Sequence, residues 1–190
     1  MIEQLKDWDQ QLFLWLNGVG HPALDDVMLF LSAKLVWIPL YALLIFLLYR
    51  RYGIQFWKPL LAIILVITIA DQVTSSFMKP FFERLRPCHD ASLDGLLINV
   101  GKCGGTYGFA SSHAANSFGL AMIFFLLSEC KKHIWLFVWA ALVSYSRIYL
   151  GVHFPGDILV GAIIGVGAGY LVFMLGSRLK LLPLSVKNQK

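Results

Sequence analysis

The sequence predicts an all-α membrane protein, a polytopic bundle of about five spanning helices with an amphipathic N-terminal helix at the membrane surface. Hydrophobic residues make up 58% of the 190 residues, and charged residues only 14%. A soluble domain has roughly 45–50% apolar and about 25% charged residues. Long apolar segments recur along the chain, and backbone in lipid is satisfied only within helices or closed barrels. We therefore predict one membrane domain over residues 1–190.

The N-terminal segment, residues 1–24, is predicted to be an interfacial helix. Leu5, Trp8, Leu12 and Trp15 recur at helical spacing, with acids and amides between them. The segment is too short and too polar to span a bilayer, but it suits a helix that lies in the interface. Packing of this helix on the rim of the bundle is an equally good interpretation.

Five later segments are apolar enough to cross a membrane. The shorter ones barely match a hydrocarbon core of roughly 30 Å at about 1.5 Å per residue, so flanking residues must complete them. The predicted spans are residues 27–48, 57–78, 114–128, 134–150 and 158–175.

The cations predict the orientation of these spans. With five spans, all the basic clusters fall on one side, which the positive-inside rule assigns to the cytoplasm. Their short runs between apolar segments do not resemble the basic face of a nucleic-acid-binding protein, so no nucleic-acid partner is expected. The cations are Arg50, Arg51, Lys58, Lys131, Lys132, Arg178, Lys180, Lys187 and Lys190.

Three separate segments bring polar and charged residues to the opposite, outward side. One is the loop over residues 79–112, the second is the start of the following helix, and the third surrounds the last outward turn. Ionisable groups at membrane depth are costly and usually functional. The residues concerned are Lys79, Arg86, Ser111, Ser112, His113, Arg147, His153 and Asp157.

These residue types form a working set for phosphoryl transfer. Three cations can neutralise phosphate oxygens, and the guanidinium fork suits phosphate particularly well. Two histidines supply a nucleophile and a proton donor. Asp157 lies four residues after His153, so its carboxylate can fix the tautomer of that imidazole.

The same residues resemble the three-part signature of the type 2 phosphatidic acid phosphatase family, which shares its site with vanadium haloperoxidases. Six residues separate Lys79 from Arg86, five separate Arg147 from His153, and three separate His153 from Asp157. The resemblance covers residues 79–157. The usual Pro-Ser-Gly-His motif is Ala-Ser-Ser-His here, at residues 110–113.

The resemblance implies a role for each residue. His153 would attack phosphorus to form a phosphohistidine, Asp157 would orient it, and His113 would protonate the leaving oxygen and then activate water. The phosphate would be bound by Lys79, Arg86, Ser111, Arg147 and the backbone N–H of Ser112. The family chemistry uses no metal and no cofactor, so neither is expected.

Two further pairs carry structural expectations. Cys88 and Cys103 lie in the outward loop, where a disulfide would stabilise the fold by roughly 3 kcal/mol and fix Arg86 relative to the next helix. Lys34 and Asp71 lie at equal depth in the first two spans and are expected to form a buried ion pair. Asp71 could instead orient Lys79.

The remaining expectations concern Arg84 and the last span. Arg84 has no place in the signature and is interpreted as a solvated cation. Gly161, Gly165 and Gly169 share one helix face, and small residues at that spacing allow close helix contact. Packing within the bundle is favoured over a homodimer formed through this face.

Together these features predict a phosphatase in the cell membrane, with its active site on the periplasmic or extracellular side. The substrate would be a lipid phosphomonoester or an isoprenoid pyrophosphate, with phosphatidylglycerol phosphate, phosphatidic acid and a lipid A phosphate fitting equally well. A lipid phosphotransferase using the same site, and a lipid-phosphate binding or transport protein without turnover, are the alternatives.

Overall fold

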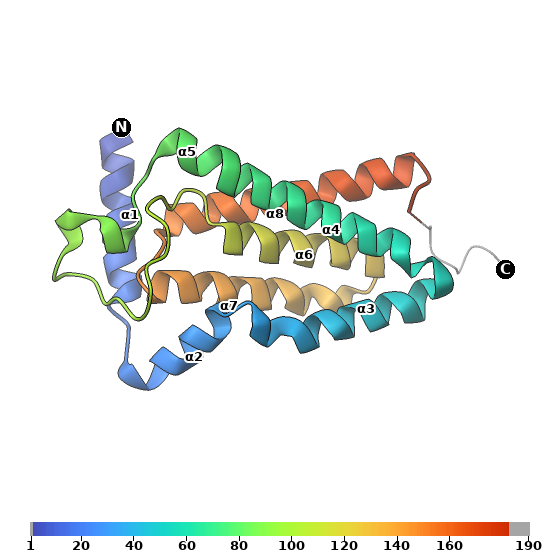
Figure 1. Cartoon of the computed structure of the whole chain (residues 1–190), viewed down its shortest axis with the longest axis horizontal. Helices are drawn as coiled ribbons and strands as arrows, with labels where there is room; N and C mark the ends of the chain where they lie inside the picture. Colours follow the sequence, from blue (N-terminus) through green and yellow to red (C-terminus); the bar gives the residue numbers. More distant parts are fainter. Residues whose placement is uncertain (1, 183–190) are drawn as a thin grey trace.

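Long helices lie side by side along one axis and form the body of the molecule (Figure 1). The computed structural model describes residues 2–182, and within them the chain forms helices and no strand. The all-α prediction is therefore confirmed. The long helices are α3 (Ile38–Tyr52), α4 (Trp57–Asp71), α6 (Ser112–Ser128), α7 (Trp135–Tyr149) and α8 (Pro155–Arg178).

Shorter elements connect the long helices. The elements before α3 are α1 (Ile2–Asn17), α2 (Pro22–Ser32) and the 3₁₀ turn η1 (Leu35–Trp37), and the 3₁₀ turn η2 (Gly53–Phe56) joins α3 to α4. A π-helical stretch, η3 (Gln72–Met78), joins α4 to α5 (Lys79–Phe82). The 3₁₀ turns η4 (Pro87–His89), η5 (Ala91–Leu93) and η6 (Lys131–Ile134) complete the described chain.

Helix α6 is the centre of the bundle, because it packs against α4, α7 and α8. One buried cluster fills the space between α3, α6 and α7, and a second fills the space between α4, α6 and α8. Ala114, Ala115 and Ala121 of α6 are completely buried. Their small side chains let the neighbouring helices approach α6 closely.

The membrane character of the chain is visible in two helical runs. Leu35–Phe82, with 48 residues, and Pro155–Arg178, with 24, are long and apolar enough to cross a bilayer, whereas the apolar helix Ser112–Ser128 is shorter. Large apolar side chains such as Leu61, Leu159 and Ile163 are more than half exposed on the outside of the bundle, as expected for surfaces that contact lipid. The number of five spans stays a prediction.

The first predicted span, residues 27–48, is not one helix. Ala33 has an extended backbone with ψ 130°, which ends α2, and α3 begins only at Ile38 with Pro39 in its first turn. The cause is local, since a proline in the first helical turn has no N–H to continue an earlier helix. The break turns Ser32 and Lys34 toward a cavity inside the bundle.

Two predicted boundaries are also wrong. The outward loop begins at Glu83 rather than Lys79, because the helical run continues to Phe82 and ends where Glu83 adopts a positive φ of 45°. The N-terminal helix ends at Asn17, not at residue 24, and α2 starts at Pro22.

Helix α1 lies across the end of the bundle that carries the outward loop, at a steep angle to the long helices (Figure 1). It is attached through Phe13, which packs on Phe154, and through Asn17, whose amide donates to the carbonyls of Ile148 and Tyr149. Trp8 and Trp15 remain 59% and 68% exposed. The helix therefore packs on the rim and also presents an apolar face suited to the interface.

The glycine face of α8 packs within the chain. A Cβ at Gly165 would lie 2.1 Å from the carbonyl oxygen of Ala115, and one at Gly161 would lie 2.5 Å from that of Ser111. Gly169 approaches Met122 and the backbone of Gly119 in the same way. The small residues bring α8 against α6, which accounts for their spacing without a second copy of the chain.

We expect Gly165→Ala to destabilise the protein by about 1–3 kcal/mol, because the new methyl group meets backbone that cannot move aside. Gly167→Ala is the matched control on the same helix, since a Cβ there has nothing within 4 Å. Thermal unfolding in detergent measures both. Equal stability of the two variants would show that close packing on α6 is not the role of Gly165, and a loss of dimers without a loss of stability would assign it to self-association.

Candidate active site

The predicted site residues of three segments converge at one end of the bundle, where α6 and α8 begin and α7 ends. A cavity of about 830 Å³ opens there, lined by six of the eight predicted site residues. The other two, Ser111 and Asp157, are completely buried just behind its wall. The six lining residues are Lys79, Arg86, Ser112, His113, Arg147 and His153.

His153 and Asp157 form a buried pair. His153 Nδ1 lies 3.2 Å from Asp157 Oδ2, and the same oxygen accepts the backbone N–H of Phe154 at 3.1 Å. Because a carboxylate only accepts, Nδ1 carries the proton, and Nε2 is left with a free lone pair. Burial lowers the pKa of His153 to about 4, although the Asp157 carboxylate opposes this shift. The imidazole is therefore neutral near pH 7, as a nucleophile must be.

Arg86 lies next to the free ring nitrogen of His153. Its Nη1 donates to His153 Nε2 at 3.0 Å and to the Val152 carbonyl at 3.2 Å, while Nε donates to the Gly105 carbonyl at 2.6 Å. Burial lowers the pKa of Arg86, although the Asp157 carboxylate opposes this shift. An anion placed between Arg86 and His153 would also oppose it.

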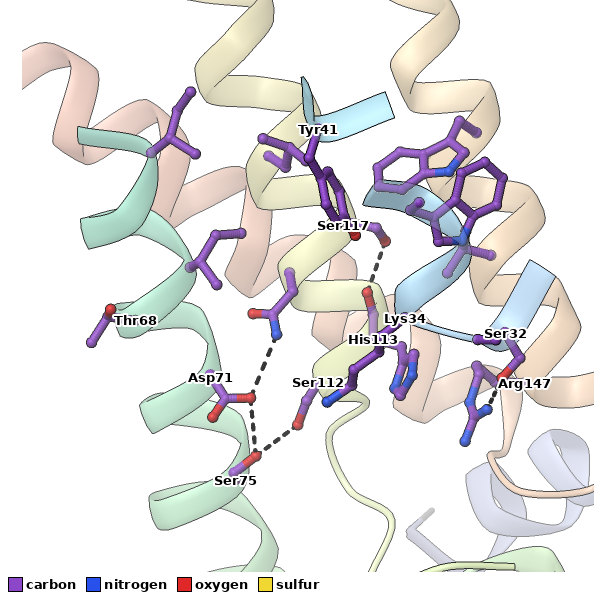
Figure 2. A pocket seen from close by; sticks show the side chains of 18 of the residues that line it. Ser32, Lys34, Tyr41, Thr68, Asp71, Ser75, Ser112, His113, Ser117 and Arg147 are labelled. Carbon is purple, nitrogen blue, oxygen red and sulfur yellow. Dashed lines mark hydrogen bonds between the residues drawn. The ribbon is translucent and has the colours of Figure 1, made fainter. Parts of the chain in front are cut away.

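Arg147, labelled in Figure 2, and Lys79 both line the cavity. Arg147 donates to the hydroxyl of Ser32, and its buried Nε has no partner. Lys79 donates to the hydroxyl of Ser112 at 2.8 Å. Arg86, Arg147 and Lys79 thus surround one cavity with cationic hydrogen-bond donors, an arrangement that suits an anion.

The two serines of the central motif have different positions. Ser111 is completely buried and caps α6 by accepting the N–H of Ala114, while its own N–H donates to the carbonyl of Asp157 at 3.0 Å. Ser112, where the usual motif has glycine, is the first residue of α6 and has no positive φ. Its hydroxyl lines the cavity and holds Lys79.

Gly108 is a site residue that the sequence analysis missed. A Cβ at this position would lie 3.0 Å from Asp157 Oδ2, 3.3 Å from Arg86 Cγ and 3.5 Å from His153 Nδ1. The backbone of the outward loop therefore passes directly over the histidine and carboxylate. Only a residue without a side chain fits there.

A series of hydrogen-bonded polar side chains extends from Lys79 into the bundle. Ser75 links the Ser112 hydroxyl, at 2.8 Å, to the Asp71 carboxylate, at 3.5 Å (Figure 2). Asn116 contacts the same carboxylate at 3.5 Å. The predicted ion pair of Asp71 with Lys34 is wrong, because both side chains line the cavity but no salt bridge joins them. Asp71 instead reaches Lys79 through Ser75.

The cavity continues from this polar end into an apolar cleft. Its walls come from α3, α4, α6 and α7, so the cleft runs along the long axis of the bundle. The apolar lining residues are Leu31, Trp37, Leu44, Ile45, Leu48, Leu60, Ile63, Ile67, Leu120, Trp139 and Val143. A ligand with an anionic end and a long apolar end would match this shape.

The outward loop is held by covalent and backbone contacts. Cys88 and Cys103 form a disulfide with their Cα atoms 5.9 Å apart, and Leu85 pairs with Tyr107 in an antiparallel bridge. The sulfur atoms and His89 lie within 4.8 Å of one another, the spacing of a metal site. Because both sulfurs are bonded to each other, neither is a thiolate that could bind a metal.

Arg84 is not the solvated cation that the sequence analysis expected. It donates to Asp157 Oδ1 at 3.0 Å and to Asp9 Oδ2 of α1 at 2.6 Å. The sequence contained little indication of this contact, because Asp9 lies 75 residues away, in α1. The second oxygen of the Asp157 carboxylate is therefore also occupied.

Comparisons with known proteins agree with this site. The PAP2 superfamily model matches residues 59–180. The chain is 42% identical over 188 residues to a lipid A 4'-phosphatase of Bacteroides thetaiotaomicron, covering 94% of this chain and 81% of the relative. It is 40% identical over 176 residues to a lipid A 4'-phosphatase of Porphyromonas gingivalis, covering 90% and 74%.

Two solved structures are similar over most of their length. LpxE of Aquifex aeolicus superposes with a TM-score of 0.68 at 32% identity, covering 87% of this chain and 94% of that one. The PAP2-type phosphatidylglycerolphosphate phosphatase of Bacillus subtilis superposes with a TM-score of 0.72 at 26% identity, covering 92% and 87%. These matches confirm the class of enzyme predicted from the sequence, a membrane phosphatase, and the chain belongs to the PAP2 superfamily.

Proposed function

We propose that this chain removes a phosphate monoester from the sugar headgroup of a glycolipid of the lipid A type. The observation that carries the proposal is the single cavity that joins the His153 nucleophile and its cations to a long apolar cleft. The cationic end fits a phosphate, and the cleft fits an acyl chain. Two relatives of 42% and 40% identity are lipid A 4'-phosphatases, which supports this headgroup.

Polar groups just inside the phosphate site favour a sugar over a plain glycerol or isoprenoid. Asn116 is one helical turn deeper than Ser112, and its buried Oδ1 has no partner. Asp71 has only long contacts, both at 3.5 Å, and Lys34 lines the same space. Hydroxyl and amide groups of a phosphorylated amino sugar would satisfy these side chains, whereas an isoprenoid would leave them unpaired.

In the first step of the proposed reaction, His153 Nε2 attacks phosphorus in line with the leaving oxygen. A P–N bond forms while the P–O bond to the sugar breaks, and His113, as an imidazolium paired with the bound phosphate, gives its proton to the sugar oxygen. Arg86 releases Nε2 and binds the phosphoryl oxygens with Arg147 and Lys79. Asp157 stabilises the charge that develops on His153.

In the second step, water replaces the histidine on phosphorus. His113, now neutral, takes a proton from this water, the P–N bond breaks, and inorganic phosphate leaves. His153 regains its neutral form for the next cycle. The positive charge that many phosphatases obtain from metal ions is supplied here by Lys79, Arg86 and Arg147, so the reaction is proposed to need no metal.

We also propose that the chain spans the membrane five times with the active site outside. Several basic residues lie on segments at the end of the bundle remote from α1 and the outward loop (Figure 1). These segments are the α3–α4 turn, η6 and the end of α8, and they carry Arg50, Arg51, Lys131, Lys132 and Arg178. Basic residues in short loops are typical of the cytoplasmic side of a membrane protein. Lys187 and Lys190, which were part of this prediction, lie outside the described residues.

The substrate proposal predicts a ranking. Purified protein in detergent should release phosphate fastest from the 4' position of lipid A, and more slowly from phosphatidylglycerol phosphate, phosphatidic acid and undecaprenyl pyrophosphate. Mass spectrometry of the lipid product identifies the position and distinguishes hydrolysis from transfer to a second lipid. Preference for the pyrophosphate would refute the headgroup assignment.

A chelator should leave the rate of phosphate release unchanged. A loss of activity that added magnesium restores would refute the metal-free mechanism.

The two histidines should respond differently to substitution. His153→Ala should abolish turnover of every substrate, because no neighbouring group can form the bond to phosphorus. His113→Ala should lower the rate on a lipid phosphomonoester about 10²–10⁴-fold, the usual size of general acid catalysis. The loss should be much smaller on p-nitrophenyl phosphate, whose leaving group needs no proton. If His113→Ala were equally inactive on both substrates while His153→Ala kept substantial activity, the two roles would have to be exchanged.

The orientation predicts which residues an impermeant thiol reagent can reach in intact cells. In a Cys130→Ser background, which keeps the Cys88–Cys103 disulfide, Asp94→Cys in the outward loop should react without lysis. Lys131→Cys, at the opposite end of the bundle, is the matched control and should react only after lysis. The reverse pattern would place the active site in the cytoplasm.

A further inference from the structure

Arg84 and Asp9 form a charged bridge between α1 and the catalytic carboxylate. Arg84 Nη1 donates to Asp157 Oδ1 at 3.0 Å, and Nη2 donates to Asp9 Oδ2 at 2.6 Å. The guanidinium carbon also lies 4.1 Å from the centre of the Phe154 ring. Arg84 is not among the residues that line the cavity, so it does not reach the substrate phosphate directly.

Asp157 needs a cation at this position. Its carboxylate is completely buried, and Oδ2 is occupied by His153 Nδ1 and the N–H of Phe154. A buried carboxylate without a counterion is strongly disfavoured. Arg84 neutralises it through the other oxygen and leaves Oδ2 free to orient the imidazole.

Asp9 in turn fixes Arg84. Its Oδ2 accepts from Arg84, and its Oδ1 accepts the N–H of Gly156 in the first turn of α8 at 2.7 Å. A Cβ at Gly156 would lie 2.8 Å from Asp9 Oδ2, so the glycine allows this approach. The Asp9 side chain is only 15% exposed. One carboxylate of α1 therefore holds both Arg84 and the start of the helix that carries Asp157.

We propose that Arg84 is a positioning residue for phosphoryl transfer, which keeps Asp157 oriented against His153, and that Asp9 makes α1 a necessary part of the active site. The inference rests on the histidine nucleophile of the proposed function, but it is independent of which lipid is the substrate. It gives the amphipathic helix a role in turnover beyond contact with the membrane surface.

Three variants and one control test the bridge, with the lipid phosphate that the wild-type protein hydrolyses fastest. Arg84→Gln should lower kcat about 10–100-fold, the range typical of partners that orient a reactive imidazole, with KM and the inhibition constant of inorganic phosphate unchanged. Arg84→Lys should recover part of this loss, because it keeps the charge. Asp9→Asn should lower kcat less than Arg84→Gln does. Asp7→Asn, an exposed acid on the same helix, should behave as wild type.

A double-mutant cycle separates action through Asp157 from direct action on the substrate. In an Asp157→Asn background, Arg84→Gln should cause little further loss of kcat, because the carboxylate that it positions is gone. In an Arg86→Gln background the two losses should multiply. Thermal unfolding of each variant shows whether the fold is kept, and Arg84→Lys and Asp9→Asn serve as the milder variants if Arg84→Gln unfolds.

Two results would overturn the proposal. A raised phosphate inhibition constant in Arg84→Gln, with losses that multiply in the Asp157→Asn background, would make Arg84 a phosphate ligand. Wild-type kcat in both Arg84→Gln and Asp9→Asn would show that the bridge has no role in turnover. Neither result bears on the assignment of His153 as the nucleophile, which an active His153→Ala variant would refute separately.

Discussion

A completely buried carboxylate, that of Asp157, is the constraint on which the active site depends. A charge in this position is tolerated only if each oxygen has partners. The imidazole of His153, the N–H of Phe154 and the guanidinium of Arg84 supply them. The backbone carbonyl of Asp157 also accepts the N–H of Ser111 at the start of α6. One residue thus joins α8, α6, the outward loop and, through Arg84, helix α1.

The close approach of α6 and α8 makes this arrangement geometrically possible. Gly161 and Gly165 bring the two helix axes so near that backbone of one contacts backbone of the other. Both helices begin at the active site, and helix N-termini favour anions. The glycine face therefore stabilises the bundle and also aligns the two helix starts around the phosphate position.

Arg84 and Arg86 contact different members of the buried His153–Asp157 pair. They lie two residues apart where the chain is extended and pairs Leu85 with Tyr107, so their side chains share one face of the segment. Arg86 contacts His153 and lines the cavity, whereas Arg84 contacts Asp157 and lies behind it. One cation is thus exposed to the cavity, and the other holds the carboxylate that contacts His153.

The sequence alone predicted the helical membrane character of the chain and the residues of the candidate site. Apolar runs specify spanning helices because lipid offers the backbone no hydrogen bonds. The fixed spacing of His153 and Asp157 across one helical turn already places an acceptor beside the imidazole. The spacing of Gly161, Gly165 and Gly169 likewise predicted a close helix contact, although not its partner α6.

The pairing of charged residues from distant segments could be seen only in the tertiary structure. The sequence pattern gives no information on the contact of Asp9 with Arg84, since Asp9 lies in α1, Arg84 lies in the loop after α5, and the position of α1 depends on the packing of Phe13 and Asn17. Equal depth in two spans suggested a pair of Lys34 with Asp71, but the first span is broken at Ala33, and the two residues line one cavity without forming that ion pair. Sequence spacing fixes neighbours along one helix, whereas pairing between helices depends on how their side chains pack in three dimensions.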